Sequence, residues 1–208
     1  MDPLAHLARC TAFLLDMDGT LYVDEQLVPG AKELLAALDR RRIPYLFLTN
    51  NSSRRGEDFR ARLERLGIPA RREQVFTSGD ATIEHLLAKT SFRAPYLVGT
   101  PALAEEFRAA GLILDASEPD CVVVGFDTTL TYEKLEGACH LLFAGKPFFA
   151  THPDKTCITK RGLVPDIAAI IAACEAVTGR SPQIIGKPYP EMVEAALRRL
   201  GTTAEATA

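Results

Sequence analysis

The feature that most constrains this chain is an apolar run that ends in two carboxylates. Residues 12–15 are apolar, and Asp16, Asp18 and Gly19 follow them. This pattern predicts a buried strand that ends at the glycine. Aspartate is rare in strands and costly to bury unpaired, so two aspartates there require a cation or a ligand. The alternative is an Asx turn, in which both side chains bond backbone amides.

Strand-like and helix-like segments alternate along the chain. The first 80 residues predict strands at 12–16, 45–48 and 75–77, separated by helices at 31–41 and 57–66. From residue 91 the pattern restarts, with strands at 95–98, 121–124 and 148–150 and helices at 101–110, 132–144 and 166–177. Residues 183–188 then lead to a last helix at 190–200. Such alternation predicts an α/β fold with a doubly wound parallel sheet and right-handed crossovers.

A second apolar strand also ends in polar residues, namely Thr49, Asn50 and Asn51, followed by Ser52 and Ser53. Hydroxyl and amide groups beside the free N–H groups of a helix amino terminus suit a phosphate dianion. Helix capping by one of the two serines is the structural alternative. Capping does not require Thr49 and Asn50, so we expect these two residues to face a ligand.

Lys187 lies between Gly186 and Pro188 near the end of the chain. A lone lysine in such a turn is usually a surface residue. Taken with the two polar strand ends, however, it completes a pattern that resembles the three motifs of the haloacid dehalogenase-like hydrolases. The resemblance implies a Rossmann-like core, with Asp16 as nucleophile and Asp18 as general acid/base. It also implies that Thr49 and Asn50 hold the phosphoryl group and that Lys187 offsets its charge.

The spacing of the motifs indicates where in the sequence a second domain is inserted. Thr49 lies 33 positions after Asp16, and Lys187 lies 138 positions after Thr49. The pattern therefore predicts a discontinuous core at 1–80 and 181–208 and an α/β cap at 81–180. This arrangement resembles the family class with a large α/β cap, which includes NagD-like enzymes, 4-nitrophenylphosphatases and phosphoglycolate phosphatases.

Cap loops contact the leaving group in that class, and the loop at 151–156 is the candidate here, with His152 and Asp154 as substrate-binding residues. Many members carry Asn-Pro where this chain has His152-Pro153. A solvated loop is the alternative for either residue.

The charges of the reacting groups explain why the chemistry that the resemblance implies needs cations. A carboxylate that attacks a phosphate dianion meets repulsion of several kcal/mol, about 4 kcal/mol for each unit of phosphate charge at 4 Å and an effective dielectric of about 20. Mg²⁺, held by Asp16 and Asp18, and Lys187 would neutralise the site. The expected function is therefore a Mg²⁺-dependent phosphomonoesterase that acts on a small phosphorylated metabolite through an aspartyl-phosphate on Asp16. A phosphotransferase is a weaker alternative.

One part of the family pattern is missing. Members continue after the last helix into a strand that ends in Gly-Asp, with a later Asp, and these residues supply metal ligands. No such motif follows residue 200, so the core is expected to be incomplete at its carboxyl end, with an unpaired edge on the 12–16 strand. A fragment of a longer gene product is the favoured interpretation. A strand recruited from a partner and a non-catalytic phosphometabolite-binding or regulatory protein are the alternatives.

Composition excludes several other classes. A net charge of −3 offers no basic footprint for nucleic acid. No apolar run is long enough to span a bilayer, and residues 1–10 lack a secretory signal pattern, so we expect a cytoplasmic protein without a membrane partner. The five cysteines show no metal-site or disulfide spacing and are expected to be reduced thiols. The apolar strands of the cap suggest a homodimer.

Overall fold

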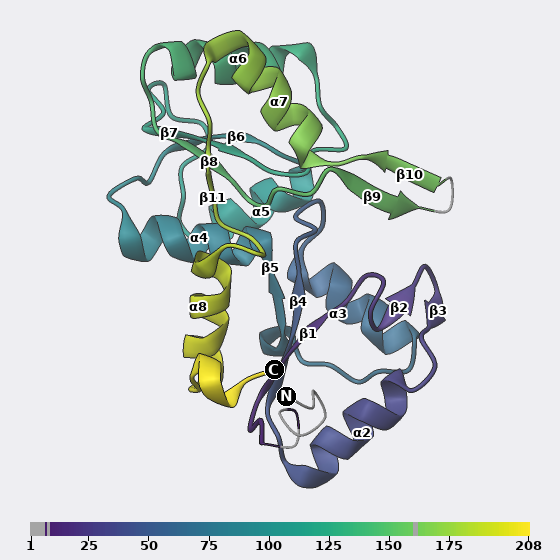
Figure 1. Cartoon of the computed structure of the whole chain (residues 1–208). Helices are drawn as coiled ribbons and strands as arrows, with labels where there is room; N and C mark the ends of the chain where they lie inside the picture. Colours follow the sequence, from purple (N-terminus) through teal and green to yellow (C-terminus); the bar gives the residue numbers. More distant parts are fainter. Residues whose placement is uncertain (1–6, 8, 160–161) are drawn as a thin grey trace. The chain divides into compact units, whose positions relative to one another are not determined.

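The computed structural model describes residues 7, 9–159 and 162–208. The chain forms two compact units, whose elements are labelled in Figure 1. The first unit comprises Met1–Thr49, Gly56–Phe76 and Val193–Ala208, and the second comprises Asn50–Arg55 and Thr77–Met192. The assignment of residues 81–180 to a cap domain remains a prediction.

The sheet of the first unit carries the two aspartates. Its strands are β1 (Phe13–Asp16), β4 (Tyr45–Thr49) and β5 (Val75–Thr77), in the order β1-β4-β5. β1 and β4 run parallel, with Asp16 opposite Leu48. The residues that follow these two strands therefore leave the sheet at the same edge. The predicted α/β class is confirmed.

Helices and short elements complete the first unit. The helices are α2 (Ala31–Arg41), α3 (Gly56–Arg65) and most of α8 (Pro190–Leu200), with 3-10 turns η1 (Arg72–Gln74) and η2 (Ala204–Ala206). A small antiparallel hairpin is formed by β2 (Tyr22–Val23) and β3 (Gln26–Leu27). The sequence pattern located the three helices to within a residue or two but not this hairpin.

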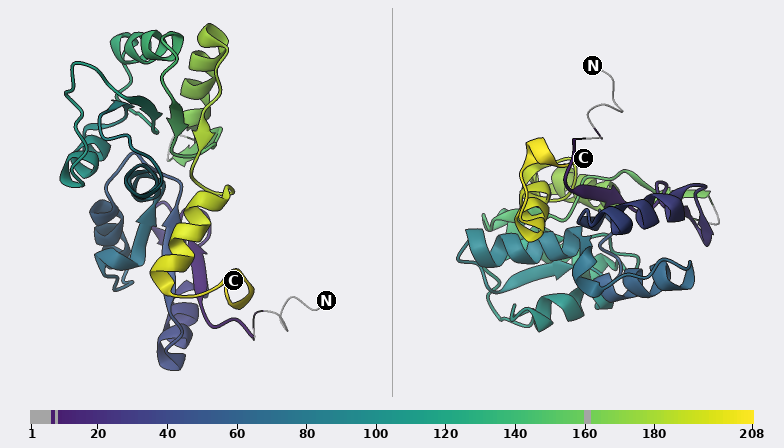
Figure 2. Two further views of the ribbon diagram at one scale, coloured as in Figure 1. Left: turned by 90° about the vertical axis from the view of Figure 1, so that its left-hand side faces the viewer. Right: turned by 90° about the horizontal axis from the view of Figure 1, so that it is seen from below.

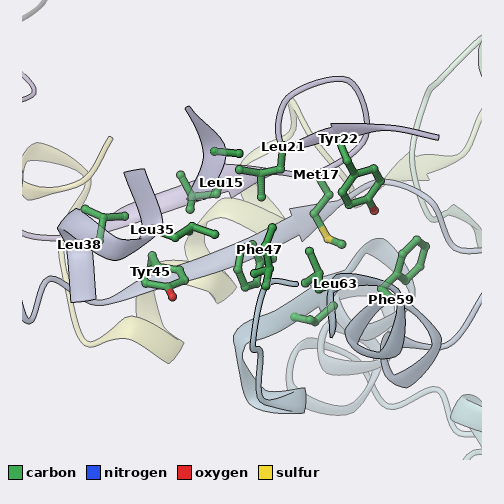
Figure 3. Packing of buried hydrophobic residues seen from close by; sticks show 13 residues of the cluster. Leu15, Met17, Leu21, Tyr22, Leu35, Leu38, Tyr45, Phe47, Phe59 and Leu63 are labelled. Carbon is green, nitrogen blue, oxygen red and sulfur yellow. The ribbon is translucent and has the colours of Figure 1, made fainter. Parts of the chain in front are cut away.

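The core of the first unit lies between its sheet and the helices α2 and α3 (Figure 3). Leu35 and Leu38 from α2 join Phe47 from β4 in one buried cluster, which also contains Phe59 and Leu63 from α3. Each side chain of this size stabilises the fold by about 1.5–3 kcal/mol when fully buried. The 3.6-residue spacing of the leucines places them on the inner face of α2.

The outer edge of β1 is partly paired, which corrects the expectation of an unpaired edge. The amide of Leu14 donates to the carbonyl of Ala208 (2.7 Å), and the amide of Ala208 donates to the carbonyl of Ala12 (3.1 Å). Ala12 and Thr207 form a parallel bridge. The last residues of the chain thus occupy the position next to β1 that a further strand would take.

The second unit is built on a four-stranded parallel sheet. Its order is β11-β8-β7-β6, with β6 (Pro95–Val98), β7 (Cys121–Val124), β8 (Phe148–Ala150) and β11 (Gln183–Ile184). Helices α6 (Tyr132–Phe143) and α7 (Ile167–Thr178) pack together on one face, as Figures 1 and 2 show. Helices α4 (Ser78–Lys89) and α5 (Pro101–Ala109) cover the other face. An antiparallel hairpin, β9 (Thr156–Thr159) and β10 (Gly162–Pro165), precedes α7.

Local side chains define where these helices begin. The hydroxyls of Thr100 and Thr131 accept hydrogen bonds from the first turns of α5 and α6, and the Asp166 carboxylate accepts one from the amide of Ile167. Such caps satisfy amides that have no partner within the helix. Among the described residues, no helix is both long and apolar enough to cross a membrane.

Candidate active site

Asp16 and Asp18 lie at the carboxyl end of β1, as predicted. Met17 between them is fully buried, so the alternation of an extended chain turns the two aspartates away from the core. The chain then turns sharply: Gly19 has a φ of 85°, and its amide donates to the carbonyl of Tyr22 (2.8 Å). The hydroxyl of Thr20 donates to Asp16 Oδ2 (3.0 Å). This turn requires a glycine because other residues rarely adopt that φ.

The carboxylate of Asp18 pairs with an arginine that the sequence did not single out. Arg62 of α3 donates from Nη1 to Asp18 Oδ1 (3.3 Å). The same guanidinium lies over the ring of Tyr22, 4.3 Å from its centroid. Burial raises the pKa of the Tyr22 phenol, and the negative charge of Asp18 raises it further. Tyr22 is therefore a neutral packing residue rather than an acid or base at ordinary pH.

Thr49 is the last residue of β4 and is buried. Because β4 pairs in parallel with β1, Thr49 comes one position after the residue opposite Asp16. The division between the two units falls immediately after Thr49. Of the predicted site residues, the first unit thus holds Asp16, Asp18 and Thr49, and the second holds Asn50, His152, Asp154 and Lys187.

Within the second unit, Asn50 fixes the backbone of Lys187. Asn50 Oδ1 accepts from the Lys187 amide (2.9 Å), and Asn50 Nδ2 donates to the Lys187 carbonyl (2.9 Å). Nδ2 also donates to the two carboxylate oxygens of Asp154, at 3.1 and 3.2 Å. These contacts use both N–H groups of the Asn50 amide. The predicted contact of Asn50 with phosphate remains a prediction.

Gly186 lets the chain pass close to this network. A Cβ atom at that position would lie 2.5 Å from the Thr151 carbonyl oxygen and 2.8 Å from Asn50 Oδ1. Since real Cβ contacts are not that short, glycine is required here for steric reasons. The Gly-Lys-Pro sequence thereby places the Lys187 backbone beside Asn50, which also bonds Asp154.

His152 lies inside the fold. Its ring is fully buried: Nδ1 is 2.9 Å from Thr151 Oγ1, and Nε2 is 3.1 Å from Asp166 Oδ1. One ligand atom from each of His152, Asp154 and Asp166 lies within 4.8 Å of the others. Mg²⁺ prefers oxygen ligands, and this set includes an imidazole nitrogen that already contacts Asp166. The arrangement therefore fits a buried hydrogen-bond network better than a magnesium site.

Asp16 and Asp18 fit magnesium better by donor chemistry. Asp16 offers a hard carboxylate oxygen at the end of a strand, and the Asp18 backbone carbonyl is the second oxygen expected to hold the ion, while the Asp18 side chain is 46% exposed. Mg²⁺ is commonly held by one or two carboxylates together with substrate phosphate and water. The donor chemistry of these two residues is therefore compatible with the predicted cofactor.

The serines after β4 do not cap a helix, which corrects the alternative reading of this segment. α3 begins only at Gly56. The Ser52 hydroxyl is 2.9 Å from Thr151 Oγ1 and accepts from the amide of Phe126 (2.9 Å), whereas Ser53 bonds Asn51 Oδ1. The Ser78 hydroxyl donates to the carbonyl of Asn50. The segment after β4 is thus held by side chains far away in sequence, which no local pattern could reveal.

Comparisons with known proteins identify the class of protein as a hydrolase. The family model described as haloacid dehalogenase-like hydrolase matches residues 13–113. The chain is 36% identical over 195 residues to the 5'-nucleotidase YutF of Bacillus subtilis, a match that covers 94% of this chain and 76% of that protein. It is 37% identical over 191 residues to an acid sugar phosphatase of Staphylococcus aureus, covering 91% and 74%.

Solved structures give the same result. A 4-nitrophenylphosphatase from Thermotoga maritima superposes with a TM-score of 0.93 and 44% identity, covering 97% of this chain and 78% of that one. NagD from E. coli K-12 superposes with a TM-score of 0.88 and 32% identity, covering 95% and 78%. The chain belongs to the haloacid dehalogenase-like hydrolases.

Proposed function

We propose that this protein is a Mg²⁺-dependent phosphomonoesterase that hydrolyses a small phosphorylated metabolite through an aspartyl-phosphate on Asp16. The observation that carries the proposal is the pair of aspartates at the end of β1, with only Met17 between them and Thr49 at the end of the adjacent strand. The names of the relatives support the reaction class, since they describe a nucleotidase, a sugar phosphatase and a nitrophenylphosphatase.

In the first half of the proposed reaction, a carboxylate oxygen of Asp16 attacks phosphorus in line with the ester oxygen. As the P–O ester bond breaks, its electron pair moves to the leaving oxygen, which takes a proton from the Asp18 carboxyl. In the second half, the Asp18 carboxylate removes a proton from water, and the resulting hydroxide attacks phosphorus. The bond from Asp16 to phosphorus then breaks, and inorganic phosphate leaves.

The other site residues are proposed to bind the phosphoryl group. Thr49 and Asn50 would orient it, and the ammonium group of Lys187 would balance its charge. Bound Mg²⁺, held by Asp16 and Asp18, would supply further positive charge against the phosphoryl oxygens. Asn50 also holds the Lys187 backbone, as its two hydrogen bonds to that residue show. We propose that residues 81–180 act as a cap, with Asp154 near the leaving group. His152 is fully buried, so its proposed part in substrate binding would be to hold the loop that carries Asp154.

The assay for this proposal is hydrolysis of 4-nitrophenyl phosphate and of a panel of nucleoside and sugar monophosphates, with Mg²⁺ or with a chelator. Asp16→Asn is expected to abolish turnover. Asp115→Asn is the matched control, because Asp115 is 85% exposed and pairs with Arg108 on the surface. Unchanged activity in Asp16→Asn would refute the proposal, and binding of phosphate esters without turnover would favour a non-catalytic role.

Two further proposals concern the protein's surroundings. We propose a homodimer that forms through residues 81–180, which light scattering of the purified chain would test. We also propose a cytoplasmic location. All five cysteines are free thiols, which suits a reducing compartment. Fractionation of cells that express the protein would test the location.

A further inference from the structure

Arg62 makes contacts that its position on a surface helix does not require. It lies on α3, yet its guanidinium points toward the turn after β1 and the β2–β3 hairpin. Nη1 donates to Asp18 Oδ1 (3.3 Å), and Nη2 donates to the carbonyl of Asp24 (2.6 Å). The guanidinium carbon lies 4.3 Å from the centroid of the Tyr22 ring. One side chain therefore contacts the proposed general acid, the hairpin turn and the core.

A neighbouring arginine on the same helix shows the ordinary alternative. Arg60 bonds Glu57 through Nε and Nη2, and its Nη1 lies 2.6 Å from Glu64. These are i,i+3 and i,i+4 pairs on the surface of α3. Arg62 instead reaches residues 38 and 44 positions earlier in the chain. The two arginines lie on the same helix, but Arg60 pairs with its neighbours on α3 and Arg62 contacts residues outside α3.

The Arg62 arrangement is not optimal for stability. Among the described residues, Arg62 Nε is one of the few buried side-chain nitrogens or oxygens that have no hydrogen-bond partner, and the nearest Glu25 oxygen is 3.9 Å away. Asp24, whose carbonyl Arg62 binds, has a φ of 51°. Unpaired buried groups and positive φ values at residues other than glycine cluster at functional sites. These features indicate that Arg62 is held in place for its effect on the neighbouring groups.

The three contacts also require the shape of arginine. A planar guanidinium can donate to a carboxylate and a carbonyl from separate nitrogens while its face packs on an aromatic ring. A lysine ammonium carries the same charge but lacks the fixed geometry. Figure 3 shows Tyr22 in the same core as Phe59 and Leu63 of α3, so the ring beneath the guanidinium is itself fixed.

We propose that Arg62 is a positioning residue that orients Asp18 for proton transfer to the leaving group and fixes the β2–β3 hairpin beside it. This inference rests on the proposed function. The hydrogen bond to Oδ1, from a guanidinium that is itself held by the Asp24 carbonyl and the Tyr22 ring, restricts the direction in which the Asp18 side chain points. Arg62 should therefore matter most where the leaving oxygen must be protonated as the P–O bond breaks.

Leaving-group dependence tests this role directly. Nitrophenolate is a stable anion and departs without taking up a proton. A sugar alkoxide is a poor leaving group and must be protonated as it departs. For Arg62→Met we expect kcat/KM to fall by about 10–100-fold on a sugar phosphate, within the range that general acid catalysis supplies. On 4-nitrophenyl phosphate we expect a loss of less than about 3-fold. Arg62→Lys should recover only part of the loss on the sugar phosphate, because an ammonium can donate to Asp18 but lacks the fixed geometry of the guanidinium.

Arg60→Met is the matched control and should behave as wild type on both substrates, because Arg60 makes only local pairs on α3. An equal loss on both substrates in Arg62→Met would overturn the inference and indicate a purely structural role. Unchanged kinetics on both substrates would also overturn it. If the proposed function is wrong, the result is different. The wild-type chain then shows no turnover, or Asp16→Asn turns over as fast as wild type.

Discussion

The contacts of Asn50 predict a strong and selective effect of a single isosteric change. In Asn50→Asp the amide nitrogen that donates to Asp154 and to the Lys187 carbonyl is replaced by an oxygen that cannot donate. Two hydrogen bonds are lost, and a carboxylate is placed about 3 Å from the carboxylate of Asp154. The shape of the side chain stays the same, so the effect isolates the loss of the donors and the added charge.

The magnitude follows from these distances. Each lost hydrogen bond is worth about 1 kcal/mol. Two unit charges 4 Å apart repel by about 4 kcal/mol at an effective dielectric of about 20. Asn50 and Asp154 are only partly buried, so water and small shifts relieve much of that repulsion. We therefore expect the free energy of unfolding to fall by about 3 kcal/mol.

The assay is urea unfolding at pH 7, followed by far-UV circular dichroism because the chain has no tryptophan. Gln26→Glu is the control for the added charge. Gln26 is exposed, so the new carboxylate stays in water. The control should stay within about 0.5 kcal/mol of wild type. Equal destabilisation of the two variants, or none in Asn50→Asp, would refute the reasoning.

Three further predictions test the core, the glycine turn and a buried thiol. Leu63→Ala should lower the free energy of unfolding by about 2–5 kcal/mol, because Leu63 is fully buried in the first unit, and a loss under about 1 kcal/mol in urea unfolding would contradict its place in that core. Gly186→Ala should destabilise the protein by about 1–3 kcal/mol and lower turnover, since its Cβ would collide with the Thr151 carbonyl; unchanged stability and turnover would count against this steric argument. Burial raises the pKa of the Cys174 thiol from 9.0 to about 12, so the folded state disfavours the thiolate, and stability should fall as the pH rises from about 9 toward about 12. Urea midpoints of wild type and Cys174→Ala, compared at pH 8 and 11, check this, and an equal pH dependence in both would argue against it.

The sequence predicted the fold well where a local pattern reports on burial. Leu34, Leu35 and Leu38 recur at helical spacing and predicted α2. Leu35 and Leu38 face the core, whereas Leu34 is 41% exposed. The apolar run before Asp16 forms β1, in parallel with β4. Short elements were missed because two-residue strands such as β2 and β3 carry no measurable period. Helix α4 was also missed, because its first turn, Ser78-Gly79-Asp80, is typical of a loop.

The sequence selects candidate site residues by type but gives none of their contacts. Asp16, Asp18, Thr49 and Lys187 are candidates because each stands at a strand end or in a glycine turn, and their roles remain predictions. Arg62 was missed because an arginine at a helical surface position looks like any solvated charge, and its contacts with Asp18 and Asp24 depend on tertiary structure. His152 looked like a loop residue, yet Thr151 and Asp166 enclose it.

The most direct test of the central claim is to trap the phosphorylated enzyme. Asp18→Asn cannot activate water, so with 4-nitrophenyl phosphate it should accumulate one covalent phosphoryl group per chain, which acid quenching and peptide mass spectrometry would locate on Asp16. The same treatment of Asp16→Asn should give no labelled peptide. The account would be contradicted if the wild-type chain turned over steadily while Asp18→Asn carried no phosphate on Asp16. Phosphate on another residue would contradict it as well.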